Sequence, residues 1–69
     1  METTKFYVVS LYNDTPYNDY YKTCNRLEAD LMVSNAIKNN RYGMLIEYVI
    51  TENADFNYKK ETKNIIKEF

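Results

Sequence analysis

Apolar residues follow one another from Phe6 to Tyr12 with only Ser10 between them, and this short run predicts a β-strand over residues 5–13. Aromatic and β-branched residues dominate this stretch, and such residues suit a pleated, half-buried surface. Tyr7, Val9 and Leu11 fall on one face and are all apolar, so we expect them to face the core. Residues 13–16 (Asn-Asp-Thr-Pro) then end the strand, because proline cannot donate a ladder hydrogen bond.

Residues 17–24 fit two kinds of secondary structure. Their tyrosines and threonine favour a second strand, joined to the first by a hairpin turn at residues 14–16. They also match a helical stripe at i, i+3, i+4 and i+7, formed by Tyr17, Tyr20, Tyr21 and Cys24. We favour the strand, because Asn25 followed by Glu28 has the pattern of a new helix N-terminus.

A helix is predicted from about residue 26 to residue 40. Apolar residues recur on one side of it at helical spacing, namely Ala29, Met32, Val33, Ala36 and Ile37, with Leu31 on the flank. Asn39-Asn40-Arg41 closes the helix. Gly43 is the only glycine, and we expect it to supply a positive φ before the next strand.

The second half of the chain begins with a strand predicted over Met44–Thr51. Its nearly continuous apolar character predicts a central strand that is covered on both faces. Residues 56–60 form a short edge strand in this interpretation, followed by a short amphipathic C-terminal helix. The apolar side of that helix would hold Thr62, Ile65, Ile66 and Phe69, and its solvated side would carry Lys59, Lys60, Lys63 and Lys67.

These elements predict an α+β fold. We expect a small three- or four-stranded, mainly antiparallel sheet, with one main helix (about 26–40) packed on one face and a short C-terminal helix. The 69 residues are enough for a single small domain. An all-helical segment over residues 14–40 is the alternative.

The small core points to self-association. Val, Ile, Leu and Phe make up only 16 of the 69 residues, and a chain of this size buries only about 60% of the surface that its unfolded form exposes. Cys24 is the only cysteine, so an internal disulfide is impossible, and the absence of histidine argues against a zinc site. We therefore predict a homodimer or a higher homo-oligomer.

Catalytic residues are scarce. The chain has no histidine to act as a general base near neutral pH. Cys24 lies between Lys22 and Arg26, whose charges could activate a thiolate, but a half-buried structural thiol is the simpler interpretation. We predict that the protein is not an enzyme and has no catalytic residues.

Metal and phosphate sites also lack the residues they need. The nearest pairs of acids, Asp14 with Asp19 and Glu28 with Asp30, are sparser than the acids of a calcium or magnesium loop. A single glycine excludes a glycine-rich phosphate loop. We predict no metal and no cofactor.

The charges argue weakly for nucleic acid. Residues 1–30 carry five acids and three bases, and this stretch holds five of the eight tyrosines. Residues 56–69 carry four lysines and two glutamates. Aromatic and basic residues are therefore segregated, whereas a nucleic-acid surface interleaves them. A nucleic-acid-binding regulator that uses the C-terminal lysine-rich surface is kept as the alternative function.

A protein-binding surface is predicted over residues 12–21. Four tyrosines stand there among short polar residues, which is typical of adaptable recognition loops. Tyr17 would lie near the centre of the surface, because Pro16 restricts the turn before it. The expected contact residues are Tyr12, Asn13, Asp14, Tyr17, Asp19, Tyr20 and Tyr21. The other interpretation is that two or three of these rings pack over the sheet, and both can hold at once.

The remaining expectations concern origin and location. Residues with AT-rich codons (Phe, Tyr, Met, Ile, Asn, Lys) number 35, whereas Gly, Ala, Arg and Pro number 7. This bias is typical of a low-GC bacterium or of its phages and mobile elements. The apolar runs are too short for a signal peptide or a spanning helix, so we expect a cytoplasmic protein without a membrane partner. We predict a small phage- or mobile-element-encoded protein that inhibits or modulates a host protein.

Overall fold

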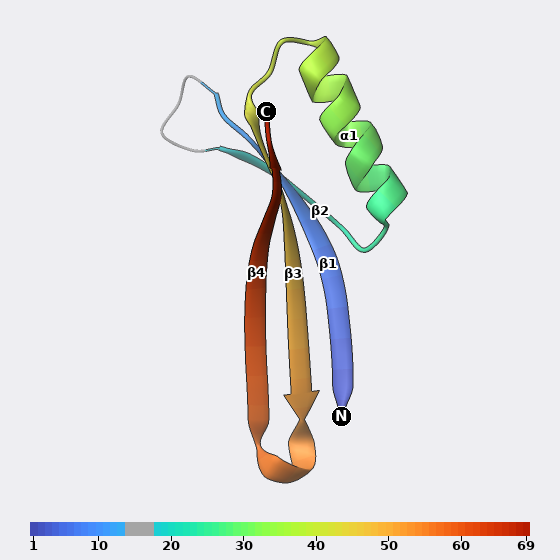
Figure 1. Cartoon of the computed structure of the whole chain (residues 1–69), viewed down its shortest axis with the longest axis vertical. Coiled ribbons are helices and arrows are strands. Elements are labelled where there is room, and N and C mark those ends of the chain that lie inside the picture. The colour runs from blue at the N-terminus through green and yellow to red at the C-terminus, as the bar shows by residue number, and fades with distance from the viewer. Residues whose placement is uncertain (14–17) are drawn as a thin grey trace.

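The computed structural model describes residues 1–13 and 18–69. In chain order, the elements are β1 (Glu2–Leu11), β2 (Asp19–Thr23), α1 (Arg26–Lys38), β3 (Gly43–Asn53), a 3-10 turn (Ala54–Phe56) and β4 (Tyr58–Glu68). The four strands form one antiparallel sheet in the order β2-β1-β3-β4. The predicted α+β class is confirmed, and the sheet has four strands (Figure 1).

The predicted core face of β1 is confirmed. Tyr7, Val9 and Leu11 are buried beneath α1, and in the sheet they lie opposite residues of β3, with Val9 paired to Leu45. The fully buried residues of the helix are small, namely Ala29, Val33 and Ala36, and the partly buried Met32 packs against the same core. Small residues let the helix approach the sheet closely, so few large side chains are needed to fill the space between the two layers.

The segment that fitted two kinds of structure forms a strand. Asp19–Thr23 pairs with Tyr7–Leu11, so β2 is a short edge strand. The Asn25 side chain then accepts hydrogen bonds from the backbone nitrogens of Leu27 (2.9 Å) and Glu28 (3.3 Å). This is the predicted N-cap, and it explains why the strand stops and a helix begins within three residues.

Two details of α1 and its exit differ from the prediction. Ile37 is 44% exposed, so the buried stripe of the helix is narrower than its apolar spacing suggests. The positive φ after the helix belongs to Asn40 (58°), and Gly43 does not adopt one. Gly43 is needed for space: a Cβ there would collide with the backbone carbonyl oxygen of Ser10 on β1.

The predicted C-terminal helix is wrong. Residues 58–68 form β4, an edge strand paired with β3 over nearly its whole length. The register shifts between Leu45 and Ile46, leaving Ile66 as an extra residue between Ile65 and Lys67. Such a bulge interrupts the two-residue alternation of a strand, so the apolar residues around it have a spacing in the sequence that resembles a helix.

The helix covers only one end of the sheet. In Figure 1, α1 lies beside the upper part of the sheet, while β1, β3 and β4 continue well below it. The molecule measures 47 × 27 × 14 Å and has a radius of gyration of 14.2 Å. A compact chain of this length has a radius of gyration of about 11 Å, so the molecule is elongated.

The prediction that β3 is covered on both faces is wrong. Among the described residues, no helix or strand lies over the face opposite α1, which we call the open face. Strand alternation and cross-strand pairing place eight apolar or aromatic residues on it: Phe6, Val8, Tyr20, Met44, Ile46, Tyr48, Ile50 and Ile65.

Candidate protein-binding surface

The tyrosines around β2 are exposed. Tyr12, Tyr20 and Tyr21 are 45%, 66% and 46% exposed, respectively. Tyr20 and Tyr21 are consecutive in β2, so Tyr21 lies on the helix side and Tyr20 on the open face. These rings do not fill the core, a role that falls to Tyr7. They leave apolar area available beside an unpaired sheet edge.

The start of β2 is fixed by an arginine that the sequence did not point to. Arg41 follows α1, and its Nη2 contacts the Asp19 carboxylate at 3.0 Å and the carbonyl oxygen of Tyr12 at 3.3 Å. The backbone nitrogen of Tyr12 also donates to the Tyr42 carbonyl at 2.9 Å. These contacts therefore join two segments that lie 20 to 30 residues apart in the chain.

The ion pair of Arg41 with Asp19 also changes the charge expected for this surface. Because the Asp19 carboxylate forms an ion pair with Arg41, its charge is matched within the chain. Asp19 therefore adds less net negative charge to this surface than the sequence suggests. The signal that could have found this pair is Arg41 itself, since it is one of only two arginines and follows the helix directly.

A shallow apolar groove lies between Tyr21 and α1. Its volume is about 220 Å³, and its lining consists of Leu11, Tyr21, Met32, Asn35, Ala36 and Asn39. We call it the β2 groove. The two asparagines give it amide groups at the helix side, and the other four residues give it apolar walls. It forms because β2 is short and α1 leans over β1, so the helix does not seal the sheet at this edge.

The predicted contact residues fall into three groups. Tyr21 lines the β2 groove, Tyr12 and Asp19 both accept hydrogen bonds from Arg41, and Tyr20 lies on the open face. Asn13 is exposed and takes part in an interaction of its own. Asp14 and Tyr17 lie outside the described residues, so the predicted central role of Tyr17 stays a prediction.

Two further groups that the sequence analysis considered for chemistry, Cys24 and Arg26, lie between β2 and the first turn of α1. Cys24 is exposed in the loop between β2 and α1, so the half-buried thiol expected from the sequence is wrong. Arg26 donates from Nε to the Asp30 carboxylate at 3.0 Å, and this hydrogen bond raises the pKa of the Arg26 guanidinium. Within residues 1–13 and 18–69, no three His, Cys, Asp or Glu side chains cluster to hold a metal ion.

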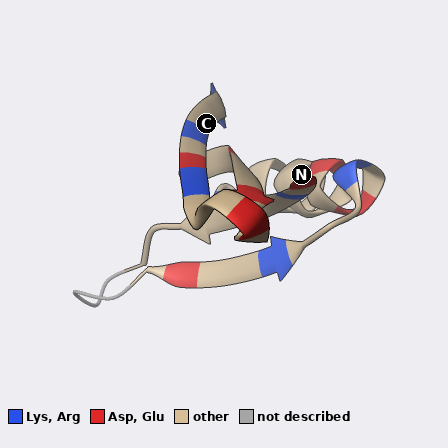
Figure 2. Ribbon diagram, turned by 90° about the horizontal axis from the view of Figure 1, so that it is seen from below, with Lys and Arg blue, Asp and Glu red and all other residues tan. Residues whose placement is uncertain are grey.

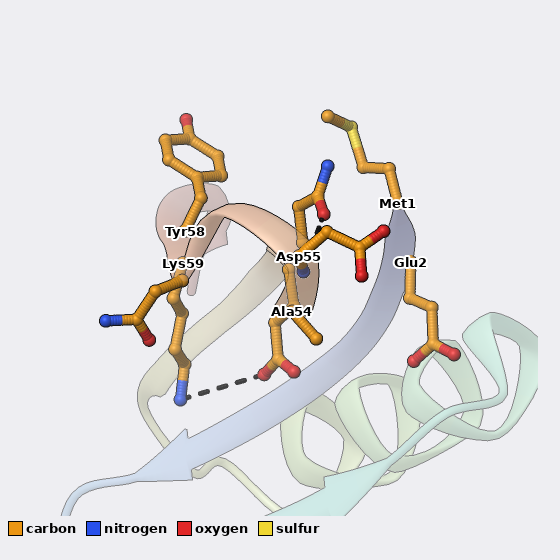
Figure 3. Close-up of a pocket in the computed structure, with 9 residues that line it drawn as sticks. Met1, Glu2, Ala54, Asp55, Tyr58 and Lys59 are labelled. Atoms are coloured by element: carbon orange, nitrogen blue, oxygen red, sulfur yellow. Dashed lines mark hydrogen bonds and ion pairs between the residues drawn. The ribbon is translucent and has the colours of Figure 1, made fainter.

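A larger hollow lies at the far end of the β3–β4 hairpin. It has a volume of about 540 Å³ and lies between the N-terminus and the hairpin turn (Figure 3). Two of its acids are Glu2 and Asp55, while its third, Glu52, is paired with Lys59 at 3.8 Å. Figure 3 shows Met1 and Tyr58 extending away from the ribbon at this tip. Its walls include no histidine or cysteine, and we assign it no chemistry.

The lysines of the C-terminal segment do not share one surface. By strand alternation, Lys59 and Lys63 lie on the open face, whereas Lys60 lies on the helix side. Glu61 and Glu68 stand among them in the same strand. Figure 2 shows basic and acidic segments interspersed over the ribbon, without a basic side. The single solvated lysine face expected from a C-terminal helix therefore does not exist.

Comparisons of this chain with protein-family models, with curated proteins and with solved structures found no match. Among the described residues, no helix is both long and apolar enough to span a membrane.

Proposed function

We propose that this chain is a small non-enzymatic protein, encoded by a phage or mobile element, that binds a host protein and inhibits or modulates it. The observation that carries the proposal is the β2 groove at an unpaired sheet edge, with the exposed ring of Tyr21 in its wall. Exposed tyrosines beside an apolar depression are typical of protein interfaces.

The size of the groove favours a side chain over a small-molecule substrate. Pockets for drug-sized ligands usually measure about 300–1,000 Å³, whereas the β2 groove measures about 220 Å³. One apolar side chain of a partner protein fits such a depression. Asn35 and Asn39 on its rim offer amide donors and acceptors to the partner's backbone. The edge of β2 offers unpaired backbone groups to an extended segment of that partner.

The arrangement of charge supports protein binding over the nucleic-acid alternative. Affinity for nucleic acid depends mainly on cations that face the phosphates together. Here Lys60 lies on the opposite face from Lys59 and Lys63, and Lys59 is paired with Glu52. A partner with phosphates would meet only some of these lysines from either face of the sheet.

Two assays run side by side separate these functions. The tagged chain is used to capture partners from a lysate of a low-GC bacterial host, and its DNA binding is measured at low salt. The proposal predicts a host protein that is retained in proportion to the tagged chain, with no salt-sensitive DNA shift. A salt-sensitive shift without a protein partner would contradict it.

The groove predicts which variant loses the partner. Tyr21→Ala removes a wall of the β2 groove and should weaken the affinity for the captured host protein by more than about 1 kcal/mol. Tyr58→Ala is the matched control, because Tyr58 is equally exposed (46%) but lies at the distant hairpin tip. Isothermal titration gives the affinities, and thermal unfolding shows whether each variant keeps its fold. Equal affinity for both variants would rule out the groove as the contact.

A further inference from the structure

The open face is apolar in its centre, and its residues pack tightly within the sheet. The rings of Phe6 and Tyr48 are stacked, with their centroids 5.1 Å apart and their planes 11° from parallel. Lys22 lies over the Phe6 ring at 4.3 Å from its centroid. Ile46 is buried by its neighbours in the sheet. The open face thus presents rings and β-branched side chains, which are the side chains that sheets use to pack on a second layer.

The two faces of the sheet differ in composition beyond the end of α1. On the helix side, the residues under α1 are apolar, and most of those beyond its reach are polar, among them Thr3, Lys5, Glu47, Thr51 and Thr62. On the open face the apolar residues continue along β3 from Met44 to Ile50. A surface that stays apolar where nothing in the chain covers it is expected to be covered by another molecule.

The surplus surface of the chain is close to what a dimer interface requires. Its accessible surface is 5267 Å², whereas a globular monomer of this mass exposes about 4,600 Å². The surplus of about 700 Å² compares with the roughly 800 Å² per partner that a standard stable interface buries. A second layer of protein packed on one face of the sheet would bury about this much accessible surface.

The charges around the open face permit it to pair with itself. Cross-strand pairing assigns three cations and four anions to this face: Lys22, Lys59, Lys63, Glu2, Glu52, Glu61 and Glu68. Their signs nearly cancel and are interspersed, so two copies of the face do not repel each other. A strongly charged partner of one sign gains no advantage at such a face.

We propose that a second copy of this chain covers the open face, so that two sheets pack face to face about a two-fold axis. The contact is isologous, because each copy contributes the same residues to it. The two sheets lie about 10 Å apart, as in other face-to-face packings. Phe6, Ile46, Tyr48 and Ile50 form the middle of the interface. The β2 groove stays outside it, so this dimer is independent of the proposed host partner.

Sedimentation equilibrium of the whole chain over micromolar to submillimolar concentrations tests this dimer. We expect a mass of twice the 8.3 kDa of the single chain. Ile50→Lys places a charge in the interface and should raise the dimer dissociation constant at least about tenfold. Val49→Lys is the matched control, since Val49 is the adjacent residue on the opposite face and should leave the dissociation constant unchanged.

Ile65→Lys is the second test variant, because Ile65 is on the edge strand β4 and already exposed, so its replacement threatens the fold least. It too should weaken the dimer. A wild-type chain of monomeric mass throughout this range would overturn the proposal. A folded Ile65→Lys or Ile50→Lys variant that dimerises as well as Val49→Lys would also overturn it. Loss of the dimer in the open-face variants alone would support it.

Discussion

Asn25 and Gly43 both stand where an element begins, yet only the role of Asn25 could be predicted from the sequence. A helix cap depends on residues within one turn of it, and the pattern of Asn25 and Glu28 is local. The role of Gly43 depends on β1, whose Ser10 lies 33 residues earlier. Tyr7, Val9 and Leu11 were likewise predicted because strand alternation is local. The ion pair of Arg41 with Asp19 was missed because it joins distant segments.

Replacing Gly43 tests the close approach of β3 and β1. Gly43→Ala places a methyl group against the backbone oxygen of Ser10, and backbone atoms cannot move aside as a side chain can. We expect the free energy of unfolding to fall by about 1–3 kcal/mol, the usual cost of overpacking. Urea unfolding measures it, with Ser34→Ala on the exposed part of α1 as the control. A loss of less than about 0.5 kcal/mol would show that the two strands separate easily there.

The Asn25 cap gives a second prediction. Asn25→Ala removes the acceptor for the backbone nitrogens of Leu27 and Glu28. The expected loss is about 1 kcal/mol in the free energy of unfolding, whereas Asn25→Asp keeps an acceptor and should stay near the wild-type value. Thermal unfolding of the three proteins under one set of conditions is the measurement. Equal losses in both variants would mean that the side-chain acceptor does not stabilise α1.

Strand β4 shows why the elements of the second half were harder to predict. Thr62, Ile65, Ile66 and Phe69 have helical spacing, but the bulge at Ile66 produces the same spacing in a strand. Periodicity cannot separate the two cases when a run is this short. Pairing with β3 decides between them, since every residue of β4 except the bulged Ile66 gains a ladder partner that a terminal helix would lack. By contrast, the sequence patterns of β1, of α1 and of the central part of β3 are clear and local, and these elements were predicted.

The end of β4 allows a test of this arrangement with two phenylalanines. Phe69 pairs through its backbone with Gly43 at 2.8 and 3.0 Å, and its ring packs against the core. Phe56 at the hairpin turn is 80% exposed. Phe69→Ala should lower the free energy of unfolding by about 1–2 kcal/mol, less than the 3–5 kcal/mol of a fully buried ring. Phe56→Ala should change it by less than about 0.5 kcal/mol. The reverse order would contradict the placement of β4.

The molecule as a whole is a sheet with one half-length helical layer, and this could not be read from the sequence. The apolar run from Met44 to Ile50 indicates burial, but it does not say whether the cover comes from the same chain. The sequence predicts cover on both faces, and among the described residues α1 supplies it on one face only. In the proposed dimer, a second copy of the chain covers the open face. The shortage of Val, Ile, Leu and Phe that favoured self-association is consistent with this arrangement.

Hydroxyl-radical footprinting at low and high protein concentration tests the central claim, that the open face is covered by protein in solution. Tyr48 lies in the middle of that face, and Tyr58 lies at the hairpin tip on the other side of the sheet. The account predicts that oxidation of Tyr48 falls several-fold as concentration rises, while that of Tyr58 stays constant. Oxidation of Tyr48 that is independent of concentration, in a sample that sediments as a monomer, would contradict it.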